Sequence, residues 1–371
     1  MQKNCFGYPV EFVDDLFGES TVLSDSLREI SGSDKPRVQI VADLNVVQHF
    51  KGLGAQIGRY VQDHNIVLAG KPVVVTGGER VKCDGMQSSH RMNSALLSAQ
   101  LRHNDIVLAI GGGSILDLAG YSAAQVRGGV KIVRVPTTPA AMMDAALADY
   151  AAIDTTTVKD ALRVRSEPAA VFIDTAFASS VLDGVWNCGI GEALRLAIAY
   201  DAGFYEKIES LGPAYVSRDP GALEEIVKEA VALRAKKGKT DFGMWATMRM
   251  EPMSGYKMPH GYGVAIGICV ELAYSVERGY VKAEERDMVV RLLGEYNALD
   301  VLRHAVPVLN QPDRLAEGLS AWALASGKQT ITVATGIGSS RTDEIPDVDV
   351  LKRALQGVLA VSPASEPSAQ A

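Results

Sequence analysis

The chain has 371 residues, 47% of them apolar, and carries a formal net charge of −7 with a pI near 5.5. This length and apolar content provide a substantial core and indicate two domains rather than one. The acidic balance leaves no basic surface for nucleic acid, and neither a charged leader nor about eighteen consecutive apolar residues indicates secretion or a membrane span, so we expect a cytoplasmic globular protein.

Three apolar segments in the first half of the chain are typical of buried strands. They cover residues 38–42, 73–76 and 105–110, and they end at Asp43, Gly77 and Gly111. Strands that end in Asp or Gly and alternate with helical patterns predict a doubly wound parallel sheet. Ligands of such sheets bind at the carboxyl ends of the strands.

Three consecutive glycines, 111–113, end the third of these strands and precede a helix that we expect to begin at Ser114. Glycine allows a tight turn and a close approach of the backbone to a ligand. Backbone N–H groups at a helix N-terminus bind phosphate. Alone, such a run could mark only a flexible turn, but after a buried strand it predicts a nicotinamide dinucleotide site.

Beyond residue 175 the sequence predicts mostly helix. Apolar residues recur at helical spacing in segments 192–205, 220–236, 264–277, 283–296 and 312–326, and a late strand covers 329–334. We expect a Rossmann-like α/β domain that binds NAD over residues 1–178 and a mostly α-helical domain over 179–361. The tail, 362–371, is rich in Pro, Ala and Ser and is predicted to be disordered.

The four cysteines are scattered along the chain without C-x-x-C spacing. They are Cys5, Cys83, Cys188 and Cys269. This pattern favours buried free thiols over a disulfide framework or a zinc knuckle.

The order of the motifs resembles that of the sugar phosphate cyclases, the family of 3-dehydroquinate synthase, over nearly the whole chain. The similar segments are 77–79, 111–120, 127–128, 136–144, 173–175, 189–192 and 260–267. Iron-type alcohol dehydrogenases and glycerol dehydrogenases share the glycine run and Pro-Thr-Thr, but Arg127-Gly128 and the surroundings of Glu192 are more similar to cyclases. Segments 8–10 and 241–245 resemble a less characterised branch found in biosynthetic gene clusters, which implies secondary metabolism.

The resemblance implies a phosphate-eliminating lyase that closes a carbon ring. In such cyclases NAD transiently oxidises an alcohol, phosphate leaves, hydride returns and an aldol reaction closes the ring. A zinc ion held by one Glu and two His polarises the reacting oxygen, while Lys and Arg side chains hold the phosphate. The resemblance also implies a small anionic substrate, a homodimer, and a helical domain that carries the metal and substrate site.

Nine positions correspond by resemblance to the NAD site. From the adenosine end to the nicotinamide end they are Asp43, Glu79, Lys82, Gly112, Gly113, Ser114, Asp117, Thr137 and Thr138. Singly, each has an ordinary structural alternative: Asp43 could be a turn residue at a strand end, and Thr138 a helix cap. Together they predict NAD binding.

The metal ligands are only partly retained. Glu192 and His260 match the family's glutamate and its last histidine, but Met244 and Met248 stand where histidines are expected. Their i, i+4 spacing places them on one helix face, as core methionines often are. A thioether suits copper(I) and is a poor zinc ligand. The sequence therefore predicts an incomplete zinc site with Met244 at the third ligand position, or a metal-free enzyme that chelators do not inhibit.

The expected substrate residues also differ from the family pattern. Lys159 keeps its place, but Tyr150, Asp154, Arg195 and Tyr262 replace Lys, Asn, Lys and Glu. The pocket is thereby less charged, which suits a substrate other than the standard heptulosonate phosphate. Arg127, Lys159 and Arg195 are predicted to bind the anionic substrate, and His260, Tyr150 or Tyr262 to transfer protons. The candidate catalytic residues are Asp144, Tyr150, Lys159, Arg195, His260 and Tyr262.

Three functions remain open from the sequence. The first is an NAD-dependent cyclase or lyase with a remodelled, metal-poor site. The second is an NAD-dependent polyol dehydrogenase, which would accumulate NADH. The third is a non-catalytic relative that binds NAD and a partner, in which the metal histidines have been lost.

Overall fold

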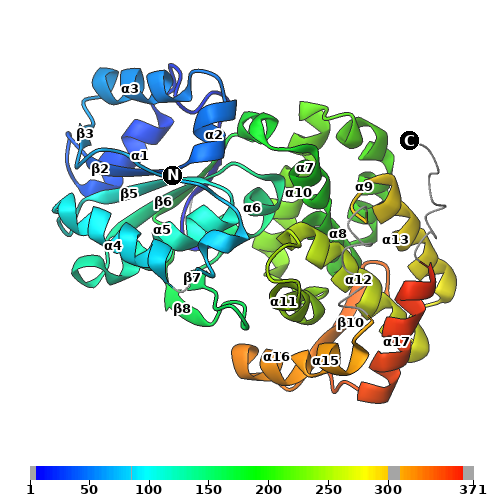
Figure 1. Cartoon of the computed structure of the whole chain (residues 1–371). Coiled ribbons are helices and arrows are strands. Elements are labelled where there is room, and N and C mark those ends of the chain that lie inside the picture. Colours follow the sequence, from blue (N-terminus) through cyan, green and yellow to red (C-terminus); the bar gives the residue numbers. More distant parts are fainter. Residues whose placement is uncertain (1–5, 85, 300–309, 362–371) are drawn as a thin grey trace, which may run out of the picture.

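The computed structural model describes residues 6–84, 86–299 and 310–361. Figure 1 shows an α/β part built from the first half of the chain beside a helical part built from the second half. The predicted boundary at residue 178 falls in the short 3-10 helix η4 (Thr175–Ser180), which follows the last strand of the α/β part. The predicted disordered tail, 362–371, and Cys5 lie outside the described residues.

Seven strands form one sheet in which all described pairings are parallel. The spatial order is β1-β9-β6-β5-β2-β3, and β4 also pairs with β2. The strands are β1 (Val10–Phe12), β2 (Arg37–Asp43), β3 (Val67–Leu68), β4 (Val73–Val75), β5 (Ile106–Gly111), β6 (Lys131–Pro136) and β9 (Ala170–Ile173). The three predicted strands are β2, β4 and β5, each within one residue of its expected bounds.

Helices cover both faces of this sheet because its strands are apolar on both sides. In β5, Ile106, Leu108 and Ile110 pack with the apolar residues of α1 (Val22–Ser31), α2 (Leu44–His49) and α3 (Leu53–Asp63). Val107 and Ala109 alternate with them and pack with α4 (Gln87–Ser98) and α5 (Gly113–Gln125). The doubly wound α/β architecture is thereby confirmed.

In the chain segment that connects β6 to β9, two short strands form an antiparallel hairpin that is not part of the parallel sheet. It consists of β7 (Tyr150–Ile153) and β8 (Leu162–Arg165), and β7 packs against α5. The chain reaches it from β6 through helix α6 (Pro139–Met143) and the 3-10 helix η3 (Ala145–Leu147). In Figure 1 the hairpin lies near the junction of the two parts.

The helical part is built around α12, whose residues are almost all buried between neighbouring helices. Its elements are α7 (Asp183–Cys188), α8 (Ile190–Tyr200), α9 (Ala202–Val216), α10 (Pro220–Lys237), α11 (Met244–Met253), α12 (His260–Glu277), α13 (Ala283–Glu295), α15 (Pro312–Ala316), α16 (Gly318–Ser326), α17 (Val348–Val361) and the hairpin β10 (Ile331–Gly336) with β11 (Ser339–Glu344).

The predicted helical segments are helical, but two of them are divided. Segment 192–205 contains the end of α8 and the start of α9, because the extended Asp201 ends one helix and its side chain accepts a hydrogen bond from the N–H of Phe204 to start the next. Segment 312–326 is divided between α15 and α16. The predicted late strand is β10, whereas its partner β11 was not predicted.

The sequence also predicted that the chain has no membrane span and that its cysteines are free thiols. Among the described residues, no helix is both long enough and apolar enough to span a membrane. Cys83, Cys188 and Cys269 are free thiols, as predicted, and the last two are buried.

Candidate active site

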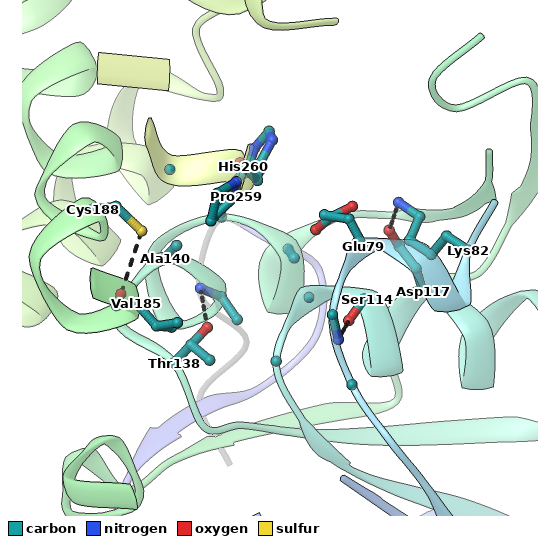
Figure 2. A pocket seen from close by; sticks show the side chains of 18 of the residues that line it. Glu79, Lys82, Ser114, Asp117, Thr138, Ala140, Val185, Cys188, Pro259 and His260 are labelled. Carbon is teal, nitrogen blue, oxygen red and sulfur yellow. Dashed lines mark hydrogen bonds and ion pairs between the residues drawn. The ribbon is translucent and has the colours of Figure 1, made fainter. Parts of the chain in front are cut away.

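One cavity of about 850 Å³ opens between the carboxyl ends of the parallel strands and the helical part. All nine residues predicted to bind NAD line it. Figure 2 shows Glu79, Lys82 and Asp117 on one side of the cavity and His260 with Cys188 on the other. Such a volume is within the usual range for pockets that bind cofactors and other small molecules.

Helix α5 points its N-terminus into this cavity. Gly112, Gly113 and Ser114 line the cavity where β5 passes into the helix. A Cβ atom on Gly112 would lie 3.0 Å from Cγ2 of Thr138, and one on Gly113 would lie 3.1 Å from Cβ of Ala145. The glycines therefore allow the start of α5 to pack closely against Thr138 and Ala145, which also line the cavity. The N–H groups at the N-terminus of this helix fit an anionic group such as a pyrophosphate.

Asp43 and Thr138 have structural roles in addition to lining the cavity. Asp43 ends β2 and caps α2, accepting hydrogen bonds from the N–H groups of Asn45 at 2.9 Å and Gly77 at 3.1 Å. Thr138 caps α6 by accepting from the N–H of Ala141 at 3.2 Å. Both structural alternatives considered from the sequence therefore hold, and both side chains still face the proposed cofactor site.

Two buried lysines of the α/β part are surrounded by carboxylates. Lys82 lies 2.6 Å from Asp117, and Lys159 lies 2.9 Å from Glu79 and 2.8 Å from Glu251 of α11. Burial alone lowers the pKa of Lys159, but the carboxylates of Glu251 and Glu79 raise it well above its ordinary value. Lys159 is therefore a charged bridge between the α/β part and the helical part.

The ion pair between Lys159 and Glu79 makes the stability of the fold depend on pH in the acidic range. Burial raises the pKa of Glu79, but Lys159 and Lys82 outweigh it and lower the pKa from 4.5 to about 2. Because the folded pKa lies below the unfolded one, the contribution to stability is present above the unfolded pKa and is lost as pH falls toward 2. We expect Glu79→Gln to make the free energy of unfolding less dependent on pH over this interval.

The measurement is denaturant unfolding at several pH values between about 5 and 2. Glu29→Gln, on the exposed face of α1, is the matched control. Equal pH slopes for the Glu79 and Glu29 variants would show that the bridge does not stabilise the fold.

Asp144, Glu192 and His260 meet on the other side of the cavity. One ligand atom from each lies within 4.8 Å of the other two. Glu192 is buried in the first turn of α8, His260 begins α12, and Asp144 ends α6. The sequence assigned only Glu192 and His260 to the metal site, so Asp144 adds an oxygen donor that was predicted as catalytic instead.

Two buried arginines hold the carboxylates of this group. Arg195 donates from Nε to Glu192 at 2.5 Å and from Nη2 to Asp144 at 2.9 Å, while Arg234 at the end of α10 also pairs with Asp144. Burial raises the pKa of Asp144, but Arg234 and Arg195 outweigh it and hold the pKa well below its ordinary range. The Asp144 carboxylate is therefore ionised and fixed in position.

Glu251 is a site residue that the sequence analysis missed. Its buried carboxylate lies 2.5 Å from Nδ1 of His260, which leaves Nε2 of His260 facing Oε1 of Glu192 at 3.5 Å. A carboxylate on one imidazole nitrogen orients the other nitrogen toward a metal. Glu251 follows Met248 by three residues on the same helix, and a lone carboxylate at that spacing was the available signal.

The donor atoms fit a divalent transition metal. Oε1 of Glu192 is buried without a hydrogen-bond partner among the described residues, although it faces His260. One imidazole nitrogen and two carboxylate oxygens form a set that Zn²⁺ and Co²⁺ accept. Met244 and Met248 line the same cavity, as expected from their shared helix face.

The remaining predicted residues occupy different positions. Tyr150 and Lys159 line the cavity. Arg195 is buried outside the cavity lining, and its guanidinium pairs with the carboxylates of Asp144 and Glu192. Tyr262 is buried in α12 and is not part of the lining either. Arg127 is exposed in the 3-10 helix η2 (Val126–Gly128), beyond the far end of α5, so its predicted role in substrate binding finds no support within one chain.

Comparison with known proteins places this architecture in a family. Residues 72–185 match the model of the 3-dehydroquinate synthase N-terminal region, and residues 189–309 match that of the C-terminal region. The 3-dehydroquinate synthase of Pyrobaculum islandicum is 31% identical over 251 residues, spanning 62% of this chain and 72% of that protein. The chain belongs to the 3-dehydroquinate synthase family. The predicted family is thereby confirmed.

Solved structures share the fold of this family member. The 2-epi-5-epi-valiolone synthase of Streptomyces hygroscopicus, solved with NAD⁺ and Zn²⁺, has a TM-score of 0.80 at 23% identity over 95% of this chain and 97% of that chain. A 2-deoxy-scyllo-inosose synthase, solved with carbaglucose-6-phosphate, NAD⁺ and Co²⁺, has a TM-score of 0.77 at 16% identity over 96% and 99%. These similarities confirm a parallel α/β domain followed by a helical domain.

Proposed function

We propose that this protein is an NAD-dependent sugar phosphate cyclase that eliminates phosphate from an anionic polyol or sugar phosphate and closes a carbon ring. The observation that carries the proposal is that the N-terminus of α5 and the group Asp144, Glu192 and His260 line the same cavity. Family membership supports the cyclase chemistry, and the residues that differ from the family pattern support a substrate other than the standard one, in secondary metabolism.

The chain's own residues divide the work between the two sides of the cavity. The N–H groups at Gly112, Gly113 and Ser114 bind the pyrophosphate of NAD. NAD supplies reversible oxidation of a substrate alcohol. Lys82 is held charged beside Asp117, so this side of the site keeps a fixed ion pair when water is excluded.

On the opposite side, Asp144, Glu192 and His260 would hold a divalent metal ion, which supplies Lewis-acid polarisation of a substrate oxygen. Glu251 orients His260, and Arg195 fixes both carboxylates. Tyr150 lies at the cavity wall with its phenol buried, and burial raises its pKa above the ordinary value. At neutral pH its hydroxyl therefore donates a hydrogen bond and does not act as a base.

The test is incubation of the protein with NAD⁺, Zn²⁺ and a panel of heptulosonate, heptulose and hexose phosphates. A cyclase releases inorganic phosphate and a carbocyclic product without net NADH, because the hydride returns to the substrate. Accumulation of NADH without phosphate release would instead establish a polyol dehydrogenase. NAD binding without either reaction over the whole panel would support the non-catalytic alternative.

The cofactor half of the proposal is tested by Gly113→Val. A Cβ at this position would lie 3.1 Å from Cβ of Ala145, so the larger valine side chain would force the N-terminus of α5 away from its place in the cavity lining. We expect the dissociation constant for NAD⁺ to rise about tenfold or more, measured by isothermal titration calorimetry. Gly58→Val, in exposed α3 with no atom near its Cβ position, is the control that should bind NAD⁺ normally. Unchanged binding in the Gly113 variant would place the cofactor elsewhere.

A further inference from the structure

Two methionines of α11 form part of the cavity wall. Met244 and Met248 both line the cavity and are only partly buried. The α11 residues between them, Trp245, Ala246 and Thr247, are buried. Because residues four apart share a helix face, the two thioethers lie next to each other on the face of α11 that meets the cavity.

This methionine wall adjoins the group Asp144, Glu192 and His260. Glu251 follows Met248 by three residues on the same face of α11, and its carboxylate lies 2.5 Å from Nδ1 of His260. Glu192 and His260 line the cavity together with both methionines. A substrate that reacts at this group therefore places neighbouring carbons against the methionine wall.

The methionine wall offers little to a substrate hydroxyl. A thioether sulfur is a weak acceptor and cannot donate. Two polar side chains of the helical part that also line the cavity are already occupied: the Cys188 thiol donates to the carbonyl of Val185 at 3.5 Å, and the Tyr256 hydroxyl donates to the carbonyl of Thr155 at 2.7 Å. Lys257 lines the cavity from the connection beyond the end of α11. A hydroxyl against the methionines would thus lose its hydrogen bonds to water and gain none from them.

We infer that Met244 and Met248 form an apolar subsite that selects a deoxygenated polyol, in which the carbon at the methionine wall bears no hydroxyl. The inference deepens the proposed function and rests on it for the cyclase reaction. The family pattern places histidine at both positions, and an imidazole nitrogen can donate to a hydroxyl or accept from one. The exchange of two imidazoles for two thioethers therefore removes the partners of a hydroxyl at this place.

The test is a titration of the protein loaded with NAD⁺ and Zn²⁺, followed by NMR of ¹³C-methyl-labelled methionine. The ligands are D-glucose 6-phosphate and its 2-deoxy, 3-deoxy and 4-deoxy forms, each of which lacks one hydroxyl of the parent. Met244→Leu and Met248→Leu assign the two methyl resonances. We expect at least one deoxy form to shift both resonances and to bind about tenfold more tightly than the parent, because a desolvated hydroxyl without a partner weakens binding by about that factor.

Met248→Gln tests whether the thioether is the origin of this preference. Glutamine is similar in length to methionine but carries an amide donor and acceptor. We expect the preference for the deoxy form to fall from about tenfold to about one in this variant, and to persist in Met248→Leu. Met253→Gln is the matched control, because Met253 lies on the same helix, is partly buried and is not part of the cavity lining. Thermal unfolding shows whether each variant retains the fold.

Three results would overturn the inference. The first is that no deoxy form binds more tightly than D-glucose 6-phosphate. The second is a preference for a deoxy form that persists in both Met244→Gln and Met248→Gln. The third is that none of the deoxy forms shifts the methyl resonances of Met244 and Met248 at the highest concentration that dissolves.

Failure of the apolar subsite can be distinguished from failure of the proposed function. A protein that releases phosphate and closes a ring without net NADH, yet binds no deoxy form more tightly than its parent, would contradict the subsite alone. A protein that prefers a deoxy form and loses this preference in Met248→Gln, yet accumulates NADH or leaves every substrate unchanged, would contradict the proposed function alone.

Discussion

Protein purified without chelator will contain about one divalent metal ion per chain, and Asp144→Asn will remove most of it. Asp144, Glu192 and His260 supply three donor atoms within 4.8 Å of one another, and two donors alone would hold the ion weakly. The measurement is elemental mass spectrometry of the wild type and the variant after the same dialysis. Glu251→Gln should lower metal affinity by roughly tenfold to a hundredfold, because it frees the His260 ring.

Met244→Leu is the decisive comparison, since Met244 occupies the third ligand position expected from the family pattern and also lines the cavity. We expect this variant to keep its metal, because the thioether is not part of the donor set. Loss of metal in Met244→Leu but not in Asp144→Asn would assign the third ligand to the thioether. Because Asp144 also pairs with Arg195 and Arg234, thermal unfolding of each variant separates loss of metal from loss of fold.

Lys159→Met will lower the free energy of unfolding by about 3–5 kcal/mol. The side chain is 6% exposed and bridges Glu79 and Glu251. Its removal leaves the buried carboxylate of Glu251 with His260 as its only ion-pair partner among the described residues, and leaves the partly buried carboxylate of Glu79 with only the more distant charge of Lys82. Methionine fills a similar volume, which limits the contribution of a cavity. Denaturant unfolding with matched m-values measures the change.

A second substitution separates charge from packing at the same place. Glu251→Gln in the Lys159→Met background should recover part of the lost stability, because one uncompensated charge is removed. If the double variant is no more stable than Lys159→Met, then Lys159 stabilises the fold through packing and not through its ion pairs. Lys236→Met, on exposed α10, is the control that should change little.

The fold could be predicted from the sequence because its signals are local. The buried strands end at residues such as Asp43 and Gly111, and the helical segments repeat apolar residues at helical spacing. The hairpin of β7 and β8 could not be predicted in this way, since each strand has only four residues, and the apolar–basic alternation of Leu162–Arg165 is too short to distinguish a strand from a loop. Short exposed strands of this kind carry little pattern.

The candidate site was predictable to a different extent on its two sides. The residues predicted to bind the cofactor lie mostly at the carboxyl ends of strands or at the starts of the helices that follow. In a parallel α/β sheet, this place in the sequence predicts that they lie at the ligand-binding edge. The metal group instead depends on contacts between distant elements: Asp144 ends α6, Glu192 lies in α8 and His260 begins α12. Nothing in the local sequence shows that Arg195 and Lys159 have their charges satisfied by carboxylates from elsewhere in the chain.

The separate hairpin makes part of the cavity wall independent of the pairing of the parallel sheet. Residues 150–165 carry Tyr150, Lys159 and Arg163, yet the strands of this segment pair only with each other among the described elements. Substitutions in this segment that retain Lys159 would alter the chemistry of the cavity wall while the parallel sheet keeps its register. Lys159 must be retained because it bridges Glu79 and Glu251. One wall of the cavity can therefore change its side chains without any change in the strand pairing that holds the α/β part together.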